Sequence, residues 1–197
     1  MNGLALHLRA RHTPAAAGLA IGVTGLVWLG WNAFSDAGRI GEKVASVTVA
    51  LACAIVSVTL ARYDESLEES GARPWSRVRG LHLLTAFVLL SCLFTAFAAT
   101  PVDFGPADFL VRDTAGLLGL AAFGAAALGP SRAWFGPVLI SVVGAVWGGA
   151  TDSHVLQVLT WMTQPADTTA ASVTAAVLAL SGTVAHMRGR VFAQTRE

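Results

Sequence analysis

The stretch PAAAGLAIGVTGLVWLGWNAF, residues 14–34, largely decides the fold of this chain. It contains 21 residues and no charged side chain, and about 20 apolar residues are what an α-helix needs to cross the hydrocarbon core of a bilayer. The apolar region of a cleaved signal peptide is shorter, at about 7–15 residues. We therefore interpret residues 14–34 as a retained membrane span, with a cleaved signal as the alternative.

The composition of the whole chain also indicates lipid as its solvent. Of 197 residues, 54% are hydrophobic and 13% are charged, whereas about 25% of the residues in a soluble domain are charged. The net charge of +1 provides no field that would attract a polyanion, so we expect no nucleic-acid partner. Cys53 and Cys92 both lie in apolar runs, which indicates buried small side chains rather than a disulfide.

Six apolar segments follow one another along the chain, and their continuous runs are typical of helices rather than of barrel strands. We predict an all-α, polytopic membrane bundle that forms a single transmembrane domain over residues 1–197. The expected spans are residues 14–34, 44–61, 81–100, 109–128, 133–150 and 169–187. The second and fifth of these lie near the lower limit of length for a span.

Lysine and arginine are distributed unevenly between the two sides of this predicted bundle. Ten of the thirteen lie in the two termini and in the loops before the third and fifth spans, and the other three are Arg39, Lys43 and Arg112. Loops rich in basic residues stay in the cytoplasm. The chain is therefore expected in the inner membrane of a bacterial cell, with both termini in the cytoplasm.

Two loops are long enough to carry a function. Residues 62–79, RYDESLEESGARPWSRVR, form the most charged one, and we interpret it as a cytoplasmic coupling loop, with a solvated connector as the alternative. Its candidate partner-binding residues are Asp64, Glu65, Glu68, Glu69 and Arg73. The outer loop, residues 151–168, contains the apolar stretch HVLQVLTWM. Nine residues are too few to span, which is consistent with a re-entrant or interfacial half-helix, and a surface turn with one amphipathic helix is the alternative.

Small residues recur at helical spacing within several spans, where they let helix backbones approach closely in lipid. The candidate helix-packing positions are Gly18, Gly22, Gly116, Gly119, Gly144 and Gly148. They favour either contact with another subunit or ordinary packing within the chain.

Arg112 and Asp113 are an ionisable pair about one turn inside the fourth span, on the outer side. Ionisable groups in a span are functional candidates, and an interfacial anchor or a structural ion pair is the alternative. Because sequence neighbours on a helix point about 100° apart, we expect each of the two to find a different partner.

The sequence shows no catalytic constellation, nucleotide-binding loop or cluster of metal ligands. Glu68, Glu69 and Arg73 match the EExxxR motif of intramembrane proteases that include the CAAX-processing enzymes, but the two histidine motifs of those enzymes are missing. We therefore predict no catalytic residue, no metal and no cofactor of the chain's own.

The predicted order of elements resembles the membrane subunit of a six-helix ABC exporter of the O-antigen and drug-exporter class. In that class the loop between spans two and three docks on the ATPase, and a re-entrant element lies between spans five and six. The segments RVRGLHLL, residues 77–84, and RDTAGLLGL, residues 112–120, also resemble small actinobacterial membrane proteins encoded beside ABC ATPases.

The resemblance implies a permease subunit that binds a separate ATPase, with ATP and magnesium on that partner, and that pairs with itself or a paralogue. The alternative is a non-transporting accessory, immunity or scaffold protein that binds another membrane protein. A third possibility, an integral membrane enzyme, requires titratable residues to converge in space.

Overall fold

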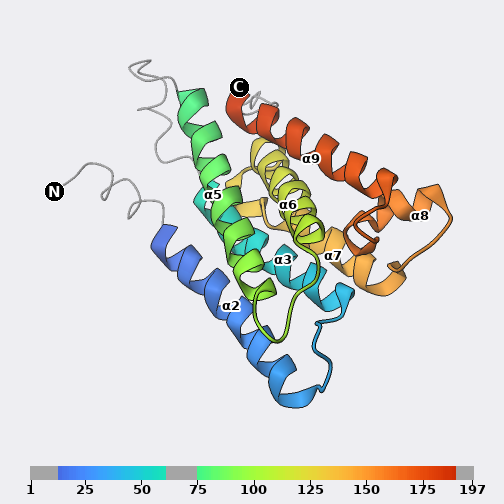
Figure 1. Ribbon diagram of the computed structural model, residues 1–197. Helices are drawn as coiled ribbons and strands as arrows, with labels where there is room; N and C mark the ends of the chain where they lie inside the picture. The colour runs from blue at the N-terminus through green and yellow to red at the C-terminus, as the bar shows by residue number, and fades with distance from the viewer. Residues whose placement is uncertain (1–12, 61–74, 190–197) are drawn as a thin grey trace.

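The computed structural model of the chain describes residues 13–60 and 75–189, and the part of the chain described is helical without β-strands (Figure 1). This confirms the all-α prediction. The α-helices are α2 (Thr13–Phe34), α3 (Glu42–Ser57), α5 (Trp75–Ala98), α6 (Ala107–Ala127), α7 (Phe135–Trp147), α8 (His154–Leu159) and α9 (Thr169–Arg188). Short 3-10 helices are η1 (Val58–Leu60), η2 (Pro130–Arg132) and η3 (Trp161–Thr163).

Within residues 13–60 and 75–189, five helical stretches have the length and the apolar composition needed to cross a membrane. They are Thr13–Phe34, Glu42–Leu60, Trp75–Phe97, Ala107–Ala127 and Thr169–Arg188. Several apolar helices of this length are typical of a membrane-spanning protein. The third of them begins at Trp75 rather than at residue 81, because residues 75–79 contain no proline and the single Gly80 is tolerated inside the helix.

The expected span at residues 133–150 corresponds to α7, which has only 13 residues. At 1.5 Å per residue such a helix is about 20 Å long, whereas the hydrocarbon core is about 30 Å thick. Turn-forming sequence limits the helix on both sides, since Gly129–Pro130 precedes it and Gly148–Gly149 follows it. A membrane crossing at α7 therefore needs the residues around the helix as well.

The centre of the bundle is formed by α3 and α6. In each of these helices 67% of the span is buried inside the protein, compared with 17% in α2, 22% in α5 and 28% in α9. Small side chains such as Ala45, Ala52, Ala121 and Ala122 face this core and are fully buried, which lets the helices lie close together. The outer helices α2, α5 and α9 surround the centre and leave large apolar side chains exposed, as lipid contact requires.

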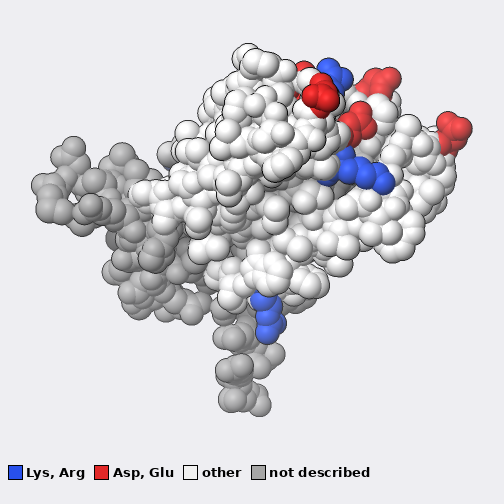
Figure 2. All heavy atoms as spheres, turned by 90° about the horizontal axis from the view of Figure 1, so that it is seen from below, with Lys and Arg blue, Asp and Glu red and all other residues white. Residues whose placement is uncertain are grey.

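Acidic residues gather at one end of the bundle, because loops that join successive helices lie at opposite ends in turn. Arg39 and Lys43 lie at this end as well, and Arg39 pairs with Asp103. The "acidic end" carries every described acidic residue except the buried Asp113, which lies further inside: Asp36, Glu42, Asp103, Asp108, Asp152 and Asp167. The "arginine end" carries Arg77, Arg79, Arg132 and Arg188 and no acidic residue among those described. Figure 2 shows the acidic side chains gathered toward one end and a broad uncharged surface beside them.

Candidate functional site

The second turn of α6 carries a buried ion pair. Nε and Nη2 of Arg112 donate to Oδ1 of Asp113 at 3.1 and 3.0 Å, and the two side chains are 8% and 0% exposed. The guanidinium also lies 5.1 Å from the ring centre of Phe109. The two side chains bond to each other, which the expectation of separate partners did not include. Each also has a partner of its own, because Arg112 bonds the carbonyls of Gln164 and Pro165 and Asp113 bonds Ser46.

The same arginine holds the chain segment that follows η3. Nη1 of Arg112 donates to the carbonyl of Pro165 and Nη2 to the carbonyl of Gln164, each at 2.9 Å. From α3, the hydroxyl of Ser46 lies 2.5 Å from the carbonyl of Met162 and 3.3 Å from Oδ2 of Asp113. Side chains from two central helices therefore converge on the backbone of residues 162–165.

Gln164 completes this group, which we call the polar clamp: Ser46, Arg112, Asp113 and Gln164. Nε2 of Gln164 donates to the carbonyl of Gly149 and to the hydroxyl of Thr160, each at 2.8 Å. Backbone that is not helical can be buried at membrane depth only where the protein supplies hydrogen-bond partners. The clamp supplies them, so its arrangement is suited to holding residues 162–165 inside the bundle.

The clamped segment enters the bundle from the acidic end. The short helix α8 is largely exposed, whereas Trp161, Met162 and Thr163 of η3 are at most 1% exposed. The ring of Trp161 lies against Gly116, where any added Cβ atom would collide with it. Gly116 lies nine residues after the start of α6, which corresponds to about 14 Å along the helix. Within residues 151–168, η3 is thus the part that reaches into the bundle.

Four of the six candidate glycines lie at close contacts within the chain. Gly116 contacts Trp161, Gly119 contacts the backbone of α9 at Ala179, and Gly144 and Gly148 contact Thr163. The partner of Gly119 across this contact is Gly182, whose missing side chain lets α9 approach α6. By contrast, a Cβ atom at Gly18 or Gly22 would meet nothing within 4 Å. These two glycines of α2 therefore do not pack against the rest of the described chain.

Sequence reasoning missed Ser46 and Gln164. Each is a single polar residue beside apolar ones, and the sequence contains many serines and threonines that bond only to their own helix, as Thr114 does with Leu110. The sequence offered one indication that Gln164 has a structural role. It lies directly before Pro165, just after the end of the apolar stretch 154–162. Its partners could not be identified from the sequence because they lie 4 and 15 residues away in the chain.

The predicted partner-binding residues of the coupling loop, Asp64, Glu65, Glu68, Glu69 and Arg73, lie outside the residues that the structure describes. The two cysteines are both free. Cys53 is buried as expected, but Cys92 is exposed, because it lies on the face of α5 that α3 and α6 do not cover.

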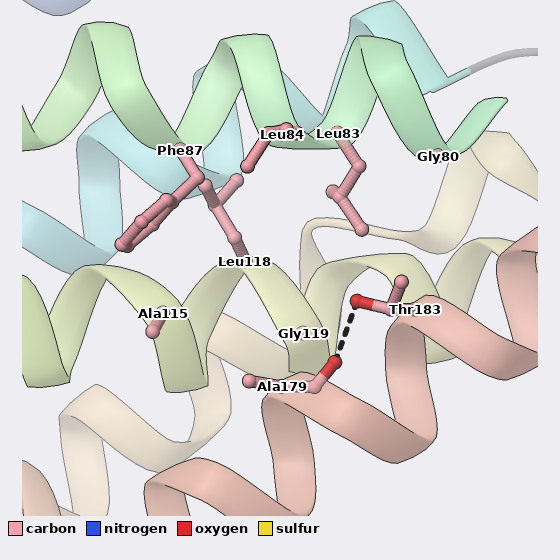
Figure 3. Close-up of a pocket in the computed structure, with 9 residues that line it drawn as sticks. All are labelled: Gly80, Leu83, Leu84, Phe87, Ala115, Leu118, Gly119, Ala179 and Thr183. Carbon is pink, nitrogen blue, oxygen red and sulfur yellow. Dashed lines mark hydrogen bonds between the residues drawn. The ribbon is translucent and has the colours of Figure 1, made fainter. Parts of the chain in front are cut away.

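A cavity of about 220 Å³ lies between α5, α6 and α9. Figure 3 shows Leu84 and Phe87 of α5 on one side and Leu118 of α6 and Ala179 of α9 on the other. The one hydroxyl in its lining, on Thr183, donates to the carbonyl of Ala179 in the same helix at 2.7 Å. This cavity therefore offers apolar surface and no polar group that a hydrophilic substrate would need.

Within residues 13–60 and 75–189, no three His, Cys, Asp or Glu side chains gather in a way that could hold a metal ion. Comparisons of the chain with protein-family models, with curated proteins and with solved structures find no match.

Proposed function

We propose that this chain is the permease subunit of an ATP-driven ABC exporter. The observation that carries the proposal is the order of the elements. Four span-length stretches precede the short α7, the clamped segment α8–η3 follows it, and α9 ends the bundle. An element that enters the bundle just before the last helix is what the resemblance to the O-antigen and drug-exporter class implies.

In this proposal α7 is a further crossing, which makes six. The positive-inside rule then assigns the arginine end to the cytoplasm of a bacterial cell and the acidic end to the outside, with both termini in the cytoplasm. Support for this orientation comes from the distribution of charge. One end carries Arg77, Arg79, Arg132 and Arg188, and the described acidic residues other than Asp113 lie at the other end.

The ATPase is a separate subunit in this proposal, and it binds ATP and magnesium. It docks on residues 62–79 through Asp64, Glu65, Glu68, Glu69 and Arg73. The cavity shown in Figure 3 is apolar, so the transport route forms between two copies of the chain or between the chain and a paralogue. The role of the polar clamp is to hold the entering segment in place.

The test is to purify the full chain from its native membrane in mild detergent and to identify the proteins that accompany it. We expect an ABC ATPase, and we expect it to be lost when Glu68→Arg and Glu69→Arg are combined. The matched control combines Asp152→Arg and Asp167→Arg, which reverses two exposed charges at the acidic end and leaves the ATPase bound. Purification of the chain without any nucleotide-binding subunit would contradict the proposal.

A second candidate function is a non-transporting accessory, immunity or scaffold protein. Its support is the outward face of α2, where Gly18 and Gly22 have no neighbour within 4 Å and Leu19 and Leu26 are 61% and 70% exposed. Co-purification of another membrane protein that tolerates the Glu68→Arg and Glu69→Arg changes would favour this candidate.

A further inference from the structure

The helix α7 runs between the arginine end and the acidic end of the bundle but is much shorter than the spans around it. Its 13 residues are about 20 Å long, compared with about 30 Å for the 20 residues of α9. The hydrocarbon core of a bilayer is also about 30 Å thick. In the proposed six-span arrangement, either the residues beside α7 or the membrane itself must make up the difference of about 10 Å.

A charged side chain marks the boundary of the hydrocarbon at the acidic end of α7. Nζ of Lys43 donates to the carbonyl of Ala145 at 3.1 Å, and this carbonyl belongs to the last turn of α7, where carbonyls have no partner within the helix. The Lys43 side chain is exposed, and a charge is costly in hydrocarbon. The polar region of the membrane therefore reaches the level of Ala145.

The arginine end of α7 has a similar boundary. Arg132 is exposed and lies three residues before the helix, and Nε1 of Trp134 donates to the carbonyl of Ser131 at 3.0 Å. Tryptophan is enriched where hydrocarbon meets the head groups, and Trp134 and Trp147 at the two ends of α7 are both exposed. These two tryptophans are about 20 Å apart along the helix axis at 1.5 Å per residue.

The backbone on either side of α7 is unsuited to hydrocarbon. Residues 128–134 form turns and the short helix η2, and residues 148–153 contain no helix, with Ala150 and Asp152 exposed. Irregular backbone does not face lipid inside the hydrocarbon, because its polar groups would have no partner there. Both flanks therefore stay at the membrane surfaces, and thinning of the bilayer is how a membrane accommodates a helix that is too short.

The outward face of α7 carries only large apolar side chains. Phe135, Leu139, Val142 and Val146 recur there at helical spacing and are all exposed. Helix interfaces in membranes are rich in small residues, but the glycines of α7 face inward, Gly136 against Leu120 and Gly144 against Met162 and Thr163. Lipid therefore fits this face better than the helix of a second copy does.

We propose that the outward face of α7 is a lipid-contact surface beside which the bilayer thins to about 20 Å. The lipids that fit it are phospholipids with short or disordered acyl chains, because extended long chains would overshoot both ends of the helix. Thinning at this face presupposes the crossing at α7 and is independent of a partner ATPase.

The test compares membrane depth at two pairs of positions with the same spacing. Phe135 and Val146 on α7 and Val173 and Val184 on α9 are each 11 residues apart, and all four are exposed. Each is changed to cysteine in the full chain with Cys53→Ala and Cys92→Ala, labelled with a nitroxide and reconstituted in phosphatidylcholine vesicles. Collisions with oxygen, which concentrates in hydrocarbon, and with a water-soluble nickel chelate report the depth of each label by electron paramagnetic resonance.

We expect each label on α7 to lie about 5 Å closer to the head groups than its counterpart on α9. Half of α7 is about 10 Å long, whereas half of an undisturbed hydrocarbon core is about 15 Å thick. Labels at Leu139 and Val142 should be the deepest on α7. In vesicles of phosphatidylcholine with shorter acyl chains the difference between the two pairs should shrink, because that bilayer already approaches the length of α7.

Three results would overturn the proposal, and they differ in what they mean for the six-span arrangement. Equal depths for the two pairs would show that α7 crosses a bilayer of normal thickness. Low collision rates with both reagents on α7 would show that protein covers this face. A depth that changes in one direction from Phe135 to Val146 would show that α7 does not cross, which would contradict the six-span arrangement as well.

Discussion

Arg112 and Arg39 each hold a carboxylate at 3.0 Å, but the two ion pairs differ in burial. The Arg39 and Asp103 side chains are 63% and 30% exposed, whereas those of Arg112 and Asp113 are 8% and 0% exposed. Removal of one partner of a buried pair leaves an uncompensated charge and costs about 3–5 kcal/mol. We expect Arg112→Met to lower the free energy of unfolding by about 3 kcal/mol or more, measured by denaturant unfolding in detergent micelles.

The control for this prediction is Arg39→Met, which removes a pair that is screened by solvent and should cost about 1 kcal/mol or less. Adding Asp113→Asn to Arg112→Met removes the stranded negative charge and should restore part of the lost stability. Equal losses in the two single variants would show that Arg112 does not hold the segment that follows η3.

At the scale of the helices, contact between α6 and α9 depends on Gly119 and Gly182. A Cβ atom at Gly119 would overlap the backbone of α9 at Ala179, and a backbone cannot move aside as the end of a flexible side chain can. We expect Gly119→Ala to destabilise the bundle by about 1–3 kcal/mol, as overpacking of a close contact does. The measurement is the unfolding free energy in detergent.

Gly18→Ala is the matched control, since it adds the same methyl group to α2 where nothing lies within 4 Å. Alanine favours a helix over glycine by up to about 1 kcal/mol, so this variant should be neutral or slightly stabilising. A loss at Gly18 comparable with the loss at Gly119 would mean that another chain packs on α2 in the purified protein.

For the whole molecule, the number of crossings depends on whether the chain changes sides at α7. Ser131 precedes α7 at the arginine end and Ser153 follows it at the acidic end, and both are exposed. In a background with Cys53→Ala and Cys92→Ala, we expect a membrane-impermeant maleimide added to intact cells to label Ser153→Cys. The Ser131→Cys variant should react only after the membrane is permeabilised, because arginine-rich ends stay in the cytoplasm.

Labelling of both cysteines from the same side of the membrane would show that α7 does not cross, and the six-span proposal would be wrong. Labelling of Ser131→Cys alone in intact cells would reverse the orientation. The helix α7 needs this test more than the others do, since its 13 residues are about 20 Å long.

The sequence by itself determined what depends on local composition and chain order. Runs such as residues 14–34 and 169–187 contain too many apolar residues for a soluble helix, so the membrane class and most of the helices follow from them. The sequence also determines at which end of the bundle each charged loop lies, because successive loops of an up-and-down bundle lie at opposite ends. The nine apolar residues 154–162 are too few to cross a bilayer, which also follows from length alone.

The tertiary structure decided which residues meet across long distances in the chain. The bonds from Arg112 to Gln164 and Pro165 and from Ser46 to Met162 connect positions 52 to 116 residues apart, and no local pattern encodes such pairs. The same holds for the partner of Gly119 and for the exposure of Cys92. Hydropathy measures whether a side chain favours lipid or water, which is a property of one residue. Hydrogen bonds and close packing depend on where a second residue lies in three dimensions.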